Sequence, residues 1–194
     1  MIDERELAFS REKPLLAWRL FRVRRVTDDY LLCSPMIHSP APPPWEPGLA
    51  LAYCFDYDHP APARRCRCGI YGAIEGTLDS LPGYLLDTSY DGDPYAYAEI
   101  ACSGRVFLDA RGVRSEEALL VQIALAEDSF AIRDDCARAR DVLAARYCVP
   151  THFSEAVPVW LTESVRQQGP PESAHSVDLS ALMQMLISQA TSGR

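Results

Sequence analysis

The sequence predicts an α+β domain built on an antiparallel, partly closed sheet of short strands, covered by one or two packed helices. Short apolar segments with alternating polar positions recur between residues 15 and 126, separated by clusters of Gly, Pro and Asp. Two later segments, 134–147 and 178–190, carry apolar residues at helical spacing instead. At 194 residues the chain is long enough to bury a hydrophobic core without a disulfide or a metal ion to stabilise it. We therefore expect a single domain at 1–166, followed by a linker and an amphipathic helix at 167–194.

The N-terminal part is expected to form two strands within residues 15–36, joined by a turn at Thr27, Asp28 and Asp29. A proline-rich segment, 39–48, follows. Because proline supplies no donor to a sheet ladder, we expect this segment to be an extended connector, with Trp45 packed on the core. A polyproline ligand for an SH3 or WW domain is the alternative interpretation.

Beyond the connector, residues 49–55 and 69–74 read as strands on either side of a loop. A stretch rich in Gly, Asp, Pro and Tyr, 75–97, indicates a long surface excursion or a lid. The next alternating segment fits a bent strand or a hairpin, with Gly104 at a bulge and Gly112 at a turn.

Residues 115–126 fit either a strand or a helix from their own pattern. The helix predicted at 134–147 should be capped by Asp134 or Asp135. Its buried face is expected to comprise Cys136, Ala139, Leu143 and Tyr147. The apolar stripe of the helix at 178–190 is expected to dock on its own domain, on a protein partner or on a second copy of the chain.

Composition excludes several classes of function. A net charge of −8 opposes binding to a phosphate backbone, so the arginines at 19, 22, 24 and 25 are interpreted as a solvated strand face. No apolar run approaches the roughly 18 residues of a membrane span, and the N-terminus does not resemble a signal peptide. We therefore expect a cytoplasmic protein whose seven cysteines are reduced thiols or metal ligands.

The strongest chemical signal is a cluster of soft ligands in the Cys/His loop, residues 54–68. Cys54, His59, Cys66 and Cys68 supply three thiols and an imidazole, the donors that zinc prefers. Four such ligands close a tetrahedral shell with no open position, so the spacing predicts a structural Zn²⁺ site.

Other interpretations of this cluster remain open. Cys54 and Cys68 fit buried strand cysteines with His59 on the surface, because cysteine is often fully buried. Cys66 and Cys68 also fit a C-x-C redox pair. Within the metal hypothesis His59 is the weakest ligand, and Cys33 or Cys102 from a neighbouring strand are candidates to replace it.

Residues 30–150 carry a more extended signature. The segments L-L-C-S-P, W-x-P-G, A-Y-C and H-P-A-P-A-R-R-C-R-C-G-I-Y follow one another, and S-G-R-V-F-L and L-A-A-R-Y-C-V-P come later. This order resembles a group of small uncharacterised actinobacterial proteins with a W…C…H-x-A-P…C-x-C-G-[IL]-Y signature. The resemblance implies that the four metal-ligand candidates belong to a site shared by the group, and it favours a strand at 115–126. It implies no activity.

These observations favour a non-enzymatic binding or adaptor domain. The alternative is a metal-dependent hydrolase or deaminase with an open zinc position, for which Glu75, Asp56 or Asp58 would act as general base. The motifs H-E-x-x-H, G-x-S-x-G and H-x-E…P-C-x-x-C are all missing. A nucleophile pair of Cys148 and His152 is a third interpretation.

Overall fold

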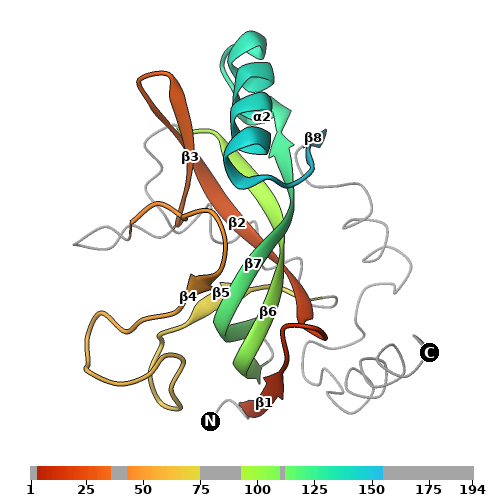
Figure 1. Cartoon of the computed structure of the whole chain (residues 1–194). Helices are drawn as coiled ribbons and strands as arrows, with labels where there is room; N and C mark the ends of the chain where they lie inside the picture. The colour runs from red at the N-terminus through yellow and green to blue at the C-terminus, as the bar shows by residue number, and fades with distance from the viewer. Residues whose placement is uncertain (1–3, 36–42, 75–92, 110–111, 155–194) are drawn as a thin grey trace, which may run out of the picture.

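The computed structural model describes residues 4–35, 43–74, 93–109 and 112–154. Within them the chain forms one eight-stranded sheet and one α-helix (Figure 1). The strands are β1 (Arg5–Phe9), β2 (Leu15–Val26), β3 (Asp29–Cys33), β4 (Ala50–Leu51), β5 (Ile70–Gly72), β6 (Tyr95–Asp109), β7 (Gly112–Ala126) and β8 (Thr151–Ser154). A short 3-10 turn, η2 (Glu127–Ser129), precedes helix α2 (Arg133–Tyr147). The predicted α+β class is confirmed.

The sheet is organised around two long strands, β6 and β7, which pair with each other along most of their length. The main path runs β3-β2-β6-β7-β4 and ends at β3 and β4, so the described sheet is open; the predictions that it is partly closed and that all its strands are short are wrong, since β6 and β7 have 15 residues each. β6 also receives β1, and β7 receives β5 and β8. Every pairing is antiparallel except the one between β7 and β8. The register shifts between Ser103 and Val106, where Gly104 has φ +72°, which confirms the predicted bulge.

Three hydrophobic clusters pack on the sheet, and two of them fill its two ends. One lies between α2 and the adjoining halves of β2, β3, β6 and β7, with Phe21, Leu32 and Leu143 fully buried. The other lies at the opposite end and includes Ile70, Ile100 and Val106. Figure 1 shows the helix at one end of the molecule and the loop between β4 and β5 at the other. The helix therefore covers only one of the two clusters.

Helix α2 docks on the β2–β3 hairpin through an apolar face and a set of polar contacts. Its buried residues are the four predicted ones, Cys136, Ala139, Leu143 and Tyr147. The Tyr147 hydroxyl donates to the carbonyl of Trp45 at 2.8 Å and accepts from the Leu32 N–H at 3.1 Å. Trp45 is thus fixed against the core, as predicted.

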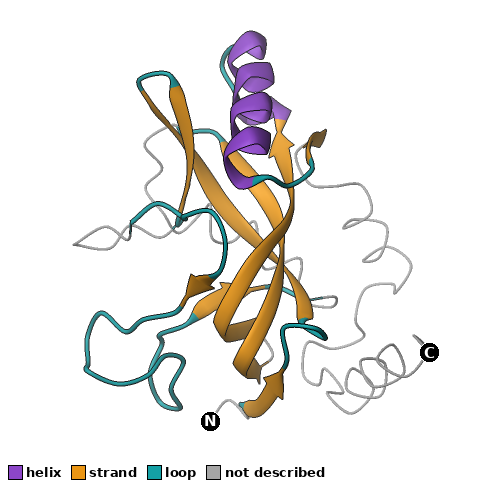
Figure 2. Cartoon of the chain, in the orientation of Figure 1, coloured by secondary structure: helices purple, strands orange, loops and turns teal. Residues whose placement is uncertain are grey.

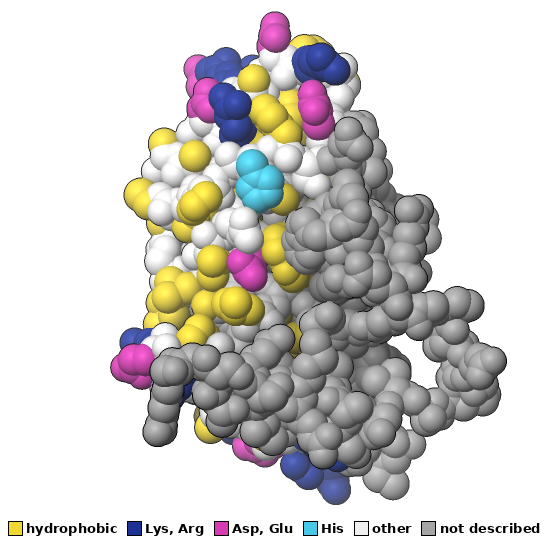
Figure 3. Space-filling model, turned by 90° about the vertical axis from the view of Figure 1, so that its right-hand side faces the viewer, with side chains coloured by type: hydrophobic (Ala, Val, Ile, Leu, Met, Phe, Trp, Pro, Cys, Tyr) yellow, Lys and Arg dark blue, Asp and Glu magenta, His cyan; other side chains and the backbone are white. Residues whose placement is uncertain are grey.

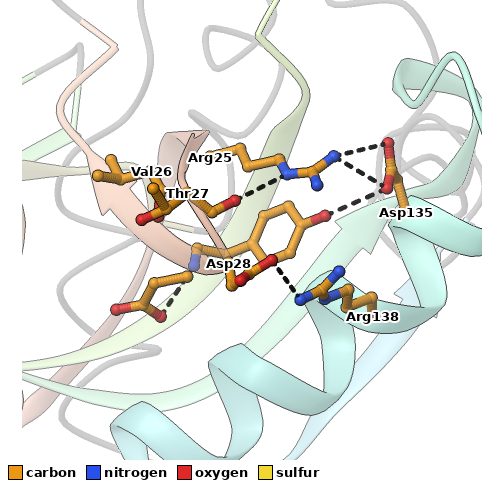
Figure 4. Close-up of polar contacts among 8 residues, drawn as sticks. Arg25, Val26, Thr27, Asp28, Asp135 and Arg138 are labelled. Atoms are coloured by element: carbon orange, nitrogen blue, oxygen red, sulfur yellow. Dashed lines mark hydrogen bonds and ion pairs between the residues drawn. The ribbon is translucent and has the colours of Figure 1, made fainter.

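Ion pairs orient the other end of the helix. Figure 4 shows Arg25 pointing to Asp135, at 3.3 Å, and Arg138 pointing to Asp28, at 2.7 Å. Such exposed pairs contribute about 0–1 kcal/mol each, so the apolar face dominates the docking. The prediction that Asp134 or Asp135 caps the helix is wrong. Ile132 occupies the N-cap position and makes no side-chain hydrogen bond there. Both aspartates lie in the first turn, where their negative charge interacts favourably with the helix dipole.

The surface is charged around α2 and more apolar below it. In Figure 3 charged side chains gather at the top of the molecule, and hydrophobic side chains gather beneath them. On β7 and β8 the exposed hydrophobic residues include Leu119, Val121 and Phe153. Among the helices of the described residues, none is long and apolar enough to cross a membrane.

Most of the predicted strands are present, with one exception. The strands and turn of 15–36 are confirmed, and residues 115–126 form a strand. The exception is the strand predicted at 49–55, which is shortened to β4; the Ala52 N–H still donates to the Glu116 carbonyl of β7 at 2.7 Å before the chain leaves the sheet. The strand predicted at 69–74 is shortened to β5, although Ala73 still bridges to Trp18.

Several predictions fall on other parts of the chain. The predicted excursion is described only from residue 93 onward. The proposed division between 1–166 and 167–194, and the helix at 178–190, lie outside the described residues.

Replacing Leu143 by alanine should lower the free energy of unfolding by about 2–5 kcal/mol, because the side chain is fully buried and leaves a cavity. Urea denaturation followed by circular dichroism measures the loss. The matched control is Leu119→Ala on β7, which is 39% exposed and should cost under about 1 kcal/mol. Equal losses for the two variants would contradict the packing described for α2.

Candidate metal centre

The Cys/His loop leaves the sheet after β4 and returns at β5. Figure 2 draws it as an irregular loop at the end of the molecule opposite the helix. Both flanking strands pair with β7, β4 opposite Glu117 and Ala118 and β5 opposite Val113 to Ser115. The loop is therefore tied at both ends to the same strand, and its two halves are held near each other.

The four predicted ligands lie together in this loop. One ligand atom from each of Cys54, His59, Cys66 and Cys68 lies within 4.8 Å of all the others, and all four residues are half-buried. The Sγ atoms of Cys54 and Cys66 are 3.6 Å apart. Two thiolates on one tetrahedral zinc ion, each bound at about 2.3 Å, would be separated by roughly 3.8 Å. The spacing therefore suits a shared metal ion, and a slight contraction would complete the shell.

His59 is oriented as a metal-binding histidine commonly is. Its Nδ1 lies 3.1 Å from the carbonyl oxygen of Pro60, and since a carbonyl accepts, Nδ1 carries the proton. This tautomer leaves the lone pair of Nε2 available for a metal ion. The imidazole ring also stacks on the ring of Tyr57, with the two ring centres 6.1 Å apart. The Pro60 carbonyl and then the Cys66 thiolate raise the pKa of His59.

The thiols of the C-x-C arm have opposite acidities. Desolvation raises the pKa of Cys66, but hydrogen bonds outweigh it, first from the backbone N–H of Cys68 and then from the neighbouring side chains, and lower that pKa to about 7. Desolvation, followed by the hydrogen bond with Cys66, raises the pKa of Cys68 to about 11. Negative charge is therefore concentrated on Cys66 and shared with its neighbours, and a divalent cation at the centre would stabilise further thiolates.

A buried arginine from β7 holds the second half of the loop. Arg114 donates through Nη1 to the carbonyl oxygens of Cys66 and Cys68, the latter at 2.8 Å, and pairs through Nη2 with Glu4. Its guanidinium lies 5.1 Å from the ring centre of Phe107. Arg105 on β6 reaches the carbonyl of Pro60 at 3.5 Å. Two strands of the sheet thus position the backbone that carries the ligands.

Gly69 allows the chain to turn out of the C-x-C arm. Its φ is +127°, and a Cβ there would lie 3.0 Å from Cβ of Pro62 and 3.2 Å from Cβ of Arg114. No other residue fits this conformation and this space without strain. Gly69 thus makes the tight turn after Cys68 possible.

Sequence reasoning found the ligands and missed the residues that hold them. Arg114 and Arg105 lie in strands more than 40 residues further along the chain, and only an arginine inside an alternating strand hints at either. The arginines at 64, 65 and 67 in the same loop are exposed. All seven cysteines are free thiols.

The other predicted site residues do not join the cluster. Cys33 and Cys102 are buried in β3 and β6 and are not part of the four-ligand group. Asp56 and Asp58 are exposed in the loop and contribute no ligand atom to that group, while Glu75 lies outside the described residues.

The proposed nucleophile pair is not assembled. The thiol of Cys148 donates to the carbonyl of Ala145 at 3.5 Å, and within the described part of the chain no hydrogen bond joins it to His152. Comparisons of the chain with protein-family models, curated proteins and solved structures find no match. Function is therefore argued from the chemistry of the site.

Replacing Gly69 by alanine should weaken zinc binding, because the added Cβ forces Pro62 or Arg114 away from the loop. The matched control is Gly48→Ala. Gly48 also has a positive φ, +93°, but nothing lies within 4 Å of its added Cβ. Both variants should lose roughly 1–2 kcal/mol of stability from the backbone conformation, and only Gly69→Ala should release zinc more readily. Competition with a chromophoric chelator measures this, and equal zinc affinities would contradict the described packing.

Proposed function

We propose that the chain is a non-enzymatic binding or adaptor domain in which a structural zinc ion, held by Cys54, His59, Cys66 and Cys68, fixes the loop 54–68. The observation that supports this proposal best is that ligand atoms of three thiols and one imidazole lie within 4.8 Å of one another. Four protein ligands fill a tetrahedral shell, so such a site has no position for a catalytic water.

Contacts of the candidate ligands with the surrounding backbone and with Arg114 support a structural role. A metal-binding histidine usually donates its other N–H to a carbonyl, as His59 does to Pro60. Positive charge from Arg114 lies next to the carbonyls of Cys66 and Cys68, where it offsets the net negative charge of three thiolates on Zn²⁺. The sheet is well packed without this loop, so the metal would shape one surface rather than hold the whole fold.

The proposal extends to a protein partner or a second copy of the chain that binds through residues 178–190. The support is the apolar stripe of that segment in the sequence. We further propose that the chain is related to the actinobacterial group that it resembles and that it is located in the cytoplasm. Free thiols in every cysteine fit a reducing compartment.

A metal-dependent hydrolase is the second candidate, and it depends on His59. This residue sits on the exposed side of the loop, between Asp58 and Pro60. If it does not bind the metal, the ion keeps three thiolates and an open position for water, with Asp56 or Asp58 nearby in sequence as base. Determining the ligand set therefore decides between the two candidates.

Purified protein prepared without chelators should contain about one equivalent of zinc, and His59→Ala should lower the zinc affinity by more than about tenfold. Metal analysis by plasma mass spectrometry and chelator competition give both values. His152→Ala, on the exposed side of β8, is the matched histidine control and should behave as the native chain. A zinc content below about 0.2 equivalents would refute the site.

Cobalt substitution separates the closed from the open shell. A closed thiolate-rich tetrahedral site should give strong visible absorption that added azide does not change. An azide-dependent spectrum for the native chain would favour the hydrolase. The same response confined to His59→Ala would show that His59 closes the shell.

Replacing Leu186 by aspartate in the full chain should reduce self-association or partner binding, because it places a charge in the apolar stripe. Analytical ultracentrifugation before and after the change measures self-association, and pull-down with the purified native chain as bait measures partner binding. Gln184→Asp, on the polar side of the same segment, is the control. If the two variants behave alike in both measurements, the stripe is not an interface.

A further inference from the structure

A cavity of about 340 Å³ lies beside the metal centre and is separate from it. We call it the connector pocket. We call Trp45 in the connector, backed by the buried ring of Phe21 on β2, its floor, and the exposed lining residues Leu51, Tyr53 and Phe55 its rim. Cys68 contributes to one wall, so the pocket adjoins the loop whose ligands were described above. Its volume is at the lower end of the range for small-molecule sites, roughly 300–1,000 Å³, which suits a ligand of one or two rings.

The floor of the pocket is aromatic and rigid. The rings of Phe21 and Trp45 meet edge to face, with centres 5.2 Å apart and planes at 89°. Phe21 is fully buried, and the backbone of Trp45 is held on both sides, its N–H by the Leu32 carbonyl at 2.7 Å and its carbonyl by the Tyr147 hydroxyl at 2.8 Å. A planar apolar ligand would find a preformed surface there, which lowers the entropy lost on binding.

Positive charge lines the same cavity. The Arg19 guanidinium lies 5.2 Å from the ring centre of Phe21 and 5.8 Å from that of Trp45, and its Nη1 donates to the Tyr71 carbonyl at 2.7 Å. Arg67 also lines the pocket. The one carboxylate among the described lining residues is Glu46, which faces Arg146 at 3.8 Å. The lining therefore favours an anion.

The rim is unusually apolar for a surface. Leu51 is 63% exposed, and Tyr53 and Phe55 are exposed beside it with ring centres 4.4 Å apart. Exposed apolar groups gathered at the mouth of a cavity are typical of a binding site. They would cover the body of a ligand whose charged end reaches the arginine.

From these contacts we propose that the connector pocket binds a small aromatic carboxylate, whose rings pack on Trp45 and the apolar rim and whose carboxylate is bound by Arg19. Guanidinium groups present a planar fork of donors that matches the two oxygens of a carboxylate. This ligand site goes beyond the metal centre: of the four candidate metal ligands only Cys68 lines the pocket, and Trp45 and Arg19 lie outside the Cys/His loop.

The test is calorimetric titration of the full chain with 1-naphthaleneacetate and with its neutral analogue 2-(1-naphthyl)ethanol. The carboxylate should bind at least about tenfold more tightly than the alcohol, because only it forms charge-assisted hydrogen bonds. The Arg19→Met variant should lose this preference. Zinc content is measured on the same sample, so that absent ligand binding is distinguished from absent metal.

Because Arg19 also supports the Tyr71 carbonyl, a second variant keeps the test independent of folding. Leu51→Glu adds a negative charge at the exposed rim and should weaken naphthaleneacetate binding several-fold while leaving the alcohol nearly unchanged. The matched control is Leu16→Glu, at 52% exposure on β2 and outside the pocket lining, which should change neither. No binding of the carboxylate below about 1 mM, equal affinities for the two probes, or equal effects of the two glutamates would overturn the proposal.

Discussion

The guanidinium of Arg114 links strand β7 to the N-terminal segment and to the Cys/His loop. It is nearly buried, at 7% exposure, on the long strand β7. From there it pairs with Glu4 near the N-terminus and donates to two carbonyls of the Cys/His loop. A buried charge is tolerated only when it is paired and fully hydrogen-bonded, so these contacts depend on one another. The position of the C-x-C arm, and hence of two metal ligands, follows from this one side chain.

The cluster of candidate metal ligands could be predicted from sequence because all four residues lie in one short loop. Local spacing limits how far apart Cys54 and Cys68 can be, whatever the rest of the fold. Helix α2 was predictable for a similar reason, since the buried face from Cys136 to Tyr147 repeats with helical spacing. Gly104 and Gly112 also marked the bulge and the turn correctly, because each has a positive φ that glycine adopts most readily.

Other features depend on contacts between distant segments and could not be predicted from the sequence. The loop anchors Arg114 and Arg105 come from strands that meet the loop only after the sheet has formed. The predicted strand at 49–55 has an alternating pattern, yet only Ala50 and Leu51 pair with β7 as a strand, and one further bond, from the Ala52 N–H to the Glu116 carbonyl, follows before the loop diverges. That alternation instead produces the exposed apolar rim of the connector pocket. The alternating apolar residues are present, but they line the pocket, and beyond Leu51 they do not pair with a strand.

The two ends of the described sheet path differ in how their backbone groups are protected. At β3 the Trp45 N–H binds the Leu32 carbonyl, so the connector covers that edge. At the opposite end, the first half of β7 is covered only by the short strands β4 and β5, which the Cys/His loop joins. An uncovered strand offers its amides and carbonyls to another chain. The loop joins the two short strands that cover this part of β7, so losing its fixed shape would leave the backbone groups there less protected.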